Sequence, residues 1–283
     1  MILNLTNPIP RAGIELEYKV SSFPDGQQSI ELTKLSQLHD EIVEIRSRLN
    51  SFKDLELIIC ANQALRNLGC KDVQLFIPYL LGGRSDRKFS IGGINYLKQV
   101  ICPIINAQEF THVTVMDPHS DVIEACLNNF NKMDNFPLVD DALSYIVGEN
   151  EDFKIALISP DAGAVKKTYD VAKHFGIQNV TTATKIREVT TGTILRTELP
   201  TIDLTDVEHI IIIDDICDGG RTFIELAKEI KKQTDKPIYL IVTHGIFSAG
   251  FVELRKYFNG IYTTNSVSDI NTIDTLLKQL NIF

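Results

Sequence analysis

The sequence lacks the features that place a protein outside the ordinary globular class. No apolar run approaches the roughly 18 residues of a membrane-spanning helix. The N-terminus has no basic segment followed by an apolar one, so no signal peptide is expected. The five cysteines are odd in number and form no Cys-x-x-Cys pair, which favours reduced thiols over a disulfide framework. With no low-complexity tract or long linker, the chain is predicted to be a cytoplasmic protein without a membrane partner.

Positive charge is also scarce. The chain has 28 Lys and Arg against 37 Asp and Glu, and its formal net charge is −9. Such a chain lacks the general electrostatic footprint of nucleic-acid-binding proteins, so no nucleic-acid partner is expected. Any phosphate site must therefore use a few local Lys, Arg and backbone N–H groups. With 283 residues, 44% of them hydrophobic, the chain can form two α/β domains of about 100–200 residues each.

Strand-like and helix-like segments alternate along the chain, which predicts an α/β fold with parallel sheets. A polar segment around residues 134–141 interrupts the pattern, so we expect domains at 1–136 and 137–283. Ligands are expected beyond the carboxyl ends of the strands. The predicted strands are 2–5, 14–20, 42–45, 73–77, 113–116, 155–158, 210–213 and 238–242, the predicted helices are 54–68, 163–175 and 221–233, and a turn is predicted at Pro24, Asp25 and Gly26.

The strongest motif follows the predicted strand at 210–213. Glycines there allow the backbone to approach a phosphate, and the start of the next helix favours an anion. Two adjacent aspartates can accept hydrogen bonds from ribose hydroxyls, and a threonine adds a hydroxyl donor. The alternative is a solvated turn with an Asp N-cap, although two aspartates after four isoleucines are an unfavourable choice for a simple turn. The motif reads Asp214-Asp215-Ile216-Cys217-Asp218-Gly219-Gly220-Arg221-Thr222.

This motif resembles the phosphoribosyl-binding loop of phosphoribosyltransferases and of ribose-phosphate pyrophosphokinases (PRPP synthetases). Other motifs resemble those of the second family, in its order and over nearly the whole chain. They are Phe23-Pro24-Asp25-Gly26-Gln27, Ile77-Pro78-Tyr79, Gly83-Arg84-Ser85-Asp86-Arg87-Lys88, Asp117-Pro118-His119, Ser159-Pro160-Asp161-Ala162-Gly163-Ala164, Lys185-Ile186-Arg187 and Thr243-His244-Gly245-Ile246-Phe247-Ser248. The resemblance implies two Rossmann-like, phosphoribosyltransferase-type domains, the first binding ATP and the second the acceptor.

The same resemblance implies an enzyme that transfers the pyrophosphoryl group of Mg-ATP to the 1-hydroxyl of ribose 5-phosphate, giving PRPP and AMP. It assigns catalysis to Lys185 and Arg187, and Mg²⁺ to His119 and Asp161. It assigns ATP binding to Phe23, Asp25, Gln27, Arg84, Ser85, Asp86 and His119. It assigns acceptor binding to Asp214, Asp215, Asp218, Gly219, Gly220, Arg221 and Thr222. The turn at Phe23 serves a neighbouring subunit in the family, which implies a homo-oligomer, a dimer or hexamer, with shared active sites.

Each of these motifs has a chemical reason and an alternative explanation. Arg84 can bind a triphosphate or stack on a base, or it belongs to a solvated basic cluster. His119 suits a metal or phosphate contact, or it is a buried structural histidine. Asp161 offers the hard carboxylate that Mg²⁺ prefers, or it is a helix N-cap. Lys185 and Arg187 lie in a Thr-rich segment that indicates a loop, where they contact phosphates or are simply exposed.

The sequence also departs from the family pattern. Arg221 replaces a glycine beside the 5-phosphate position, Gln27 replaces a glutamate and Ser85 replaces a glutamine. The segment at residues 7–10 leads almost directly to the next strand, where the family has a helix. An arginine at position 221 is either a surface residue or a contact for a second acceptor phosphate. ADP-ribose carries such a phosphate, and some compact phage-type relatives are thought to pyrophosphorylate it for rebuilding NAD.

Ribose 5-phosphate remains the first choice of acceptor because it needs fewer assumptions. Two other functions are open. A phosphoribosyltransferase would consume PRPP, but the matched first half and the Arg84 segment argue against it. A non-catalytic regulatory subunit would also resemble the family, but the presence of Lys185, Arg187, Asp161 and His119 argues against it.

Overall fold

The chain divides into two compact units. Unit 1 comprises Met1–Asp134 together with Phe283, and unit 2 comprises Asn135–Ile282. The division falls inside the polar segment in which a domain change was predicted. The computed structural model describes residues 1–7, 11, 13–33, 38, 40–148, 154–187, 194–271 and 275–283, with the main chain alone at 187, 194 and 195. In these ranges no helix is long and apolar enough to cross a membrane.

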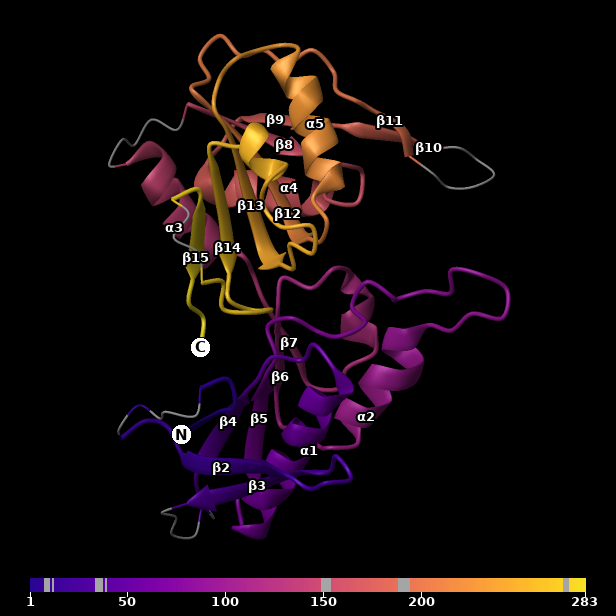
Figure 1. Ribbon diagram of the computed structural model, residues 1–283, viewed down its shortest axis with the longest axis vertical. Coiled ribbons are helices and arrows are strands. Elements are labelled where there is room, and N and C mark those ends of the chain that lie inside the picture. The colour runs from indigo at the N-terminus through magenta and orange to yellow at the C-terminus, as the bar shows by residue number, and fades with distance from the viewer. Residues whose placement is uncertain are drawn as a thin grey trace. The chain divides into compact units, whose positions relative to one another are not determined.

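Unit 1 contains a five-stranded parallel sheet in the order β1-β4-β5-β6-β7 (Figure 1). An antiparallel hairpin, β2–β3, packs against helix α1. The strands are β1 Ile2–Asn4, β2 Glu17–Ser22, β3 Gln28–Thr33, β4 Ile42–Arg46, β5 Asp72–Phe76, β6 Val113–Met116 and β7 Phe130–Met133. The helices are α1 Phe52–Asn67, a π-helical segment η1 Leu97–Ile101 that continues into α2 Cys102–Asn106, and a 3₁₀ segment η2 Asp121–Ala125.

Local sequence explains where α1 begins and which side it buries. Ser51 and Asp54 form a capping box, in which each side chain bonds the other residue's backbone N–H. Leu55, Ile58 and Leu65 then recur at helical spacing and are 0–2% exposed. This apolar face joins the unit 1 core, so the predicted amphipathic helix is confirmed.

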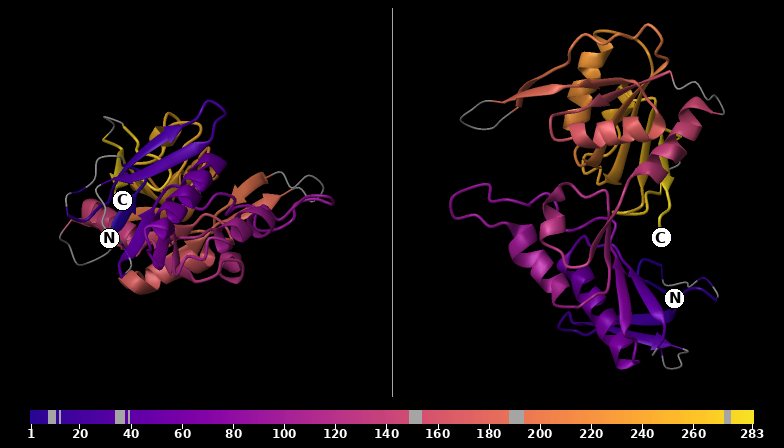
Figure 2. Two further views of the ribbon diagram at one scale, coloured as in Figure 1. Left: turned by 90° about the horizontal axis from the view of Figure 1, so that it is seen from below. Right: turned by 180° about the vertical axis from the view of Figure 1, so that it is seen from behind.

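Unit 2 contains a six-stranded parallel sheet in the order β15-β14-β13-β12-β8-β9 (Figures 1 and 2). A separate antiparallel pair, β10–β11, extends away from this sheet in Figure 1 and in the right-hand view of Figure 2. The strands are β8 Ile155–Ser159, β9 Asn179–Thr182, β10 Thr184–Arg187, β11 Ile194–Glu198, β12 His209–Cys217, β13 Ile238–Gly245, β14 Gly260–Thr264 and β15 Leu277–Leu280. The helices are α3 Phe136–Val147, α4 Val165–Phe175, α5 Arg221–Lys231 and a 3₁₀ segment η3 Leu254–Lys256.

The isoleucine run in β12 shows how this sheet is buried. Ile210 and Ile212 pack in the core that includes α5, whereas Ile211 and Ile213 pack in the core that includes α3 and α4. All four are 0% exposed. Because successive side chains of a strand point to opposite faces, a strand covered on both sides must be apolar at every position. The predicted fold class, α/β with parallel sheets, is confirmed.

Some local predictions were wrong. The segment at Lys185 was expected to be a loop, but residues 184–187 form β10, paired with β11. Helix α3 was not expected in the polar segment after Asp134, and its Pro137 lies in the first turn, where a proline is well tolerated. Strand β2 begins at Glu17, three residues after the expected start at 14.

Candidate active site

The acceptor motif forms a strand, a tight turn and a helix. Strand β12 ends at Cys217, and α5 begins at Arg221. Gly220 is the N-cap of α5 with φ +77°, a left-handed conformation that favours glycine. A Cβ atom there would lie 3.1 Å from Leu254. The turn therefore presents the open N-terminus of α5 at the carboxyl end of the sheet, an arrangement that favours an anion.

The loop after β13 supports this turn. The backbone N–H groups of Ile246 and Phe247 donate to the carbonyl of Cys217 at 2.9 and 3.1 Å. Ser248 Oγ donates to Asp218 Oδ1 at 2.6 Å. A Cβ atom at Gly245 would lie 2.2 Å from the Phe247 ring, so only glycine fits there. The Thr-His-Gly-Ile-Phe-Ser motif thus has a structural reason, which is to hold the acceptor turn in place.

Two aspartates precede the turn on β12. The Asp214 Oδ1 atom accepts a hydrogen bond from the backbone N–H of Asp215 at 2.9 Å. Burial and the neighbouring carboxyl group of Asp215 raise the pKa of Asp214 well above its usual value. Lys167 on α4 forms an ion pair with the second aspartate, and its Nζ lies 3.5 Å from Asp215 Oδ1.

Asp161 lies in the loop between β8 and α4 and is held by both carboxylate oxygens. Its Oδ1 accepts backbone N–H bonds from Gly163 and Ala164 at 2.9 and 3.2 Å. Its Oδ2 accepts a bond from Lys185 Nζ at 2.5 Å. Burial alone would raise the pKa of Asp161, but the hydrogen bond and charge of Lys185 outweigh it, so the pKa is lowered.

Strand β10 brings Lys185 to the acceptor turn. Besides Asp161, the Lys185 Nζ contacts Thr222 Oγ1 at 3.2 Å, and the lysine side chain is 9% exposed. Three predicted site residues from separate segments of unit 2 therefore meet around one ammonium group. Lys185 is not the exposed lysine that the alternative explanation requires. The main chain of Arg187 belongs to β10, and its side chain lies outside the described residues.

Arg221 begins α5, and its side chain is exposed. The described part of the chain provides it with neither a hydrogen-bond partner nor an ion-pair partner. It lies directly beside the helix N-terminus that the turn presents. A second anionic group next to the first could therefore be reached by this guanidinium.

Four of the predicted ATP residues, Arg84, Ser85, Asp86 and His119, lie on two neighbouring segments of unit 1. Ser120 Oγ, next to His119, donates to Asp86 Oδ2 at 2.6 Å and so ties the loop after β6 to the segment of Arg84. The side chain of Asn95 also holds the Asp86 carbonyl at 2.5 Å. His119 and Arg84 are both exposed, so the buried structural histidine considered above is not what the structure shows.

The loop after β6 also contains a strained residue. Asp117 is 3% exposed and has φ +42°, and its N–H bonds the carbonyl of Met133 at 2.7 Å. Non-glycine residues in this conformation are uncommon and concentrate at functional sites. Contacts with neighbouring residues, rather than the conformational preference of Asp117 itself, therefore hold the loop that contains His119.

The hairpin turn between β2 and β3 carries three predicted ATP residues. The turn is closed by backbone bonds between Phe23 and Gln27 at 2.9 Å and between Gly26 and Phe23 at 2.9 Å. Asp25 Oδ1 accepts the N–H of Gln27 at 3.2 Å. The predicted turn is confirmed, and it leaves the Phe23 side chain 53% exposed.

The predicted metal ligands are His119 and Asp161. In the ranges that the structure describes, no three His, Cys, Asp or Glu side chains gather where they could hold a metal ion. His119 belongs to unit 1 and Asp161 to unit 2. One carboxylate with a lowered pKa fits Mg²⁺, which takes few protein ligands and keeps water and substrate phosphates. The residues therefore fit an ion that arrives with its nucleotide rather than a preformed protein cage.

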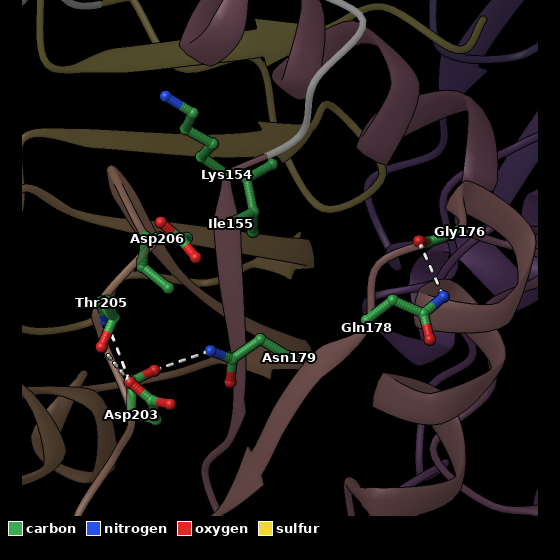
Figure 3. Close-up of a pocket in the computed structure, with 9 residues that line it drawn as sticks. Lys154, Ile155, Gly176, Gln178, Asn179, Asp203, Thr205 and Asp206 are labelled. Carbon is green, nitrogen blue, oxygen red and sulfur yellow. Dashed lines mark hydrogen bonds between the residues drawn. The ribbon is translucent and has the colours of Figure 1, made fainter.

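A pocket of about 270 Å³ lies elsewhere in unit 2 (Figure 3). It lies beside the amino ends of β8 and β9, so none of the predicted site residues contributes to it. Asn179 donates to the carbonyl of Asp203 at 2.9 Å within it, and Thr205 bonds the Asp203 side chain. Its lining residues are Lys154, Ile155, Gly176, Gln178, Asn179, Asp203, Thr205, Asp206 and Val207.

Sequence comparison shows which known proteins this chain resembles. The chain is 25% identical over 294 residues to a ribose-phosphate pyrophosphokinase of Pyrococcus abyssi, covering 97% of this chain and 94% of that one. It is 28% identical over 287 residues to the enzyme of that name in Campylobacter jejuni, covering 98% of this chain and 85% of that one. This chain is therefore similar to ribose-phosphate pyrophosphokinases over nearly its whole length. The predicted resemblance to this family is thereby confirmed, and so is the prediction of an enzyme.

The fold agrees with that similarity. A solved phosphoribosylpyrophosphate synthetase of Mycobacterium smegmatis superimposes with a TM-score of 0.79 at 17% identity, covering 95% of this chain and 87% of that one. No family model matches the chain. The family motifs are therefore carried on the family's fold in a divergent sequence.

Proposed function

We propose that this enzyme transfers the pyrophosphoryl group of ATP to the 1-hydroxyl of ribose 5-phosphate, giving PRPP and AMP. The observation that carries the proposal is the convergence of Lys185, Asp161 and Thr222 at the N-terminus of α5. There a buried ammonium group lies beside an anion-binding turn and a carboxylate. Among the reactions of phosphorylated sugars, this combination suits transfer of a highly charged group next to a bound phosphate.

The acceptor would be held at the turn after β12. The N–H groups at the start of α5 and the Thr222 hydroxyl would bind the 5-phosphate, since Gly220 leaves the backbone open to it. Asp214 and Asp215 would accept hydrogen bonds from the ribose hydroxyls. Asp218 would stay in its bond with Ser248 and keep the turn closed.

In the reaction, the acceptor's anomeric oxygen forms a bond to the β-phosphorus of ATP while the bond between that phosphorus and the α-phosphate bridging oxygen breaks. Lys185 would stabilise the negative charge on the transferred group, and Arg187 would act with it. Mg²⁺, when bound, would supply charge neutralisation on the ATP phosphates. His119 of unit 1 and Asp161 of unit 2 are each proposed as a protein ligand for Mg²⁺. Positioning and electrostatic stabilisation would provide most of the acceleration.

ATP would be bound by the exposed residues of unit 1. Arg84 would contact the triphosphate or the base, with Ser85 and Asp86 shaping the same segment. The turn with Phe23, Asp25 and Gln27 would serve the adenine of a neighbouring subunit. The proposal therefore includes a homo-oligomer with shared sites.

The test is to incubate the protein with ATP, Mg²⁺ and ribose 5-phosphate, and to follow nucleotides and phosphorus signals together. We expect one AMP and one PRPP for each ATP consumed, with no AMP when the acceptor is omitted. Release of ADP instead of AMP would mean transfer of a single phosphoryl group and would contradict the proposal. Consumption of added PRPP with a nucleobase, without ATP, would indicate a phosphoribosyltransferase. Lys185→Ala is the matched inactive control.

The exposed and unpartnered Arg221 favours ADP-ribose as a second candidate acceptor. Its guanidinium has up to five donors and suits a second phosphate. If ADP-ribose is the acceptor, Arg221→Gly should raise the KM for ADP-ribose, because binding should weaken by about 1.5–3 kcal/mol. Ribose 5-phosphate use should stay intact or improve. Equal and small effects on both acceptors would remove the reason for considering the larger one.

A further inference from the structure

Lys167 is a half-buried lysine whose place in the fold the acceptor motif alone does not explain. It lies in the first turn of α4, which packs against β8 and β12. Its side chain is 18% exposed, and its Nζ is 3.5 Å from Oδ1 of Asp215, whose side chain is 7% exposed. Lysine is rarely buried without a carboxylate partner, because taking the ammonium group out of water is costly. Lys167 is thus directed at the acceptor aspartates from a helix that contains no acceptor motif.

The aspartate pair needs such a partner. Asp214 and Asp215 are adjacent at the end of β12, and the Asp215 backbone N–H donates to Asp214 Oδ1 at 2.9 Å. Burial, followed by the neighbouring carboxyl group, raises the pKa of Asp214 well above its usual value, whereas the charge of Lys167 lowers it. Two adjacent carboxyl groups therefore share one ammonium group, whose Nζ lies 3.5 Å from Asp215 Oδ1.

We propose that Lys167 is the counter-ion of the Asp214–Asp215 pair and keeps one of its carboxylates ionised, so that the pair can accept hydrogen bonds from the hydroxyls of the acceptor's sugar. This inference rests on the proposed function, in which the pair binds the ribose of the acceptor. Lys167 is a positioning residue, because it acts on the substrate through Asp215. Charge-assisted hydrogen bonds are roughly twice as strong as neutral ones, so losing the carboxylate weakens the sugar contacts directly.

Other titratable groups surround this end of β12. His244 on β13 is buried and shares a hydrogen bond with Ser266 through Nδ1 at 2.9 Å. Cys217 ends β12 and Asp218 follows it. Burial raises the pKa of the Cys217 thiol to about 12, so it stays neutral. On α4, Lys166 is exposed, unlike Lys167.

The kinetic test uses Lys167→Met and Lys167→Gln, which remove the charge, and Lys167→Arg, which keeps it. Lys166→Met is the matched control on the same helix. At neutral pH we expect the neutral variants to raise the KM for ribose 5-phosphate roughly tenfold or more, with the KM for ATP unchanged. As pH rises the mutant pair ionises again, so this increase should shrink. Lys167→Arg and Lys166→Met should stay close to wild type.

Two results would contradict the proposal. A KM increase that is the same at every pH, or a Lys167→Arg variant as impaired as Lys167→Met, would reduce Lys167 to a structural role and overturn the proposal. Circular dichroism confirms folding of each variant. The two neutral substitutions differ in polarity, so a packing defect of one would not be shared by the other.

A second readout does not depend on activity. Protein labelled with ¹³C at the aspartate carboxyl carbons reports the titration of the pair by NMR, with coupled steps that belong to both residues. In Lys167→Met the lower step, which creates the single carboxylate, should move to higher pH than in wild type, and an unmoved lower step would overturn the inference. If wild-type protein releases no AMP with any sugar phosphate, the proposed function fails, while the NMR titration still decides whether Lys167 is the counter-ion.

Discussion

Replacing Lys185 with alanine separates catalysis from stability at this site. Its Nζ bonds Asp161 Oδ2 at 2.5 Å and Thr222 Oγ1 at 3.2 Å. Loss of the charged bond costs about 1.5–3 kcal/mol and loss of the neutral one about 1 kcal/mol. Release of the lysine side chain returns about 2 kcal/mol of rotamer entropy. The free energy of unfolding should therefore fall by only about 1 kcal/mol.

The loss of activity should be larger. A positioned donor that acts on transition-state charge contributes on the order of 10²–10³ in rate, or about 2.7–4 kcal/mol. We therefore expect kcat of Lys185→Ala to fall by that factor while the KM for ATP changes little. Steady-state AMP release and urea unfolding measure the two effects. Lys173→Ala, on an exposed part of α4, is the control.

The pH dependence of stability adds a check. The folded-state pKa of Asp161 is lowered, so its pairing with Lys185 stabilises the fold above the usual carboxyl pKa. This contribution disappears as pH falls through the lowered value. The stability difference between wild type and Lys185→Ala should accordingly vanish in acid. A kcat within about threefold of wild type would refute the catalytic assignment, and a stability difference that persists in acid would refute the ion pair.

Three further outcomes are expected. Gly245→Ala should destabilise unit 2 by about 1–3 kcal/mol in urea unfolding, since its Cβ would lie 2.2 Å from the Phe247 ring; an unchanged midpoint would contradict the packing argument. Ile211→Ala should cost about 2–5 kcal/mol, because the side chain is 0% exposed between β12 and the helices; a smaller loss would mean that the site collapses around the gap. Mixing a Phe23→Ala variant with a Lys185→Ala variant should restore partial activity if sites are shared; a fully active monomer in sedimentation would rule out shared sites.

Much of the acceptor site could be predicted from the sequence because its information is local. The isoleucine run requires a strand covered on both faces, and Gly219 and Gly220 with the following helix predict an anion-binding turn. The family motifs assigned catalysis to Lys185, and the structure then shows its Nζ at 3.2 Å from Thr222 Oγ1. None of these steps depends on knowing which distant residues meet.

The contacts of the site could not be predicted in the same way. Lys167 belongs to an ordinary amphipathic helix in the sequence, and only the packing of α4 on β12 brings it to Asp215. Strand β10 was mistaken for a loop because three of its four residues are polar or charged, and in the described residues it pairs with β11 alone. Helix α3 was hidden because Pro137 and its polar neighbours are typical of turns as well as of helix starts.

The two-stranded β10–β11 pair has a consequence for motion. A two-stranded ladder without a sheet on either side is marginally stable by itself, whereas the central strands of a six-stranded sheet open only when the whole unit unfolds. Backbone amides of β10 should thus exchange with solvent deuterium far sooner than those of β12. Lys185 can in this way leave and rejoin its partners while the acceptor turn keeps its shape, so that the reactive charge and the platform that binds the sugar belong to different cooperative units of the protein.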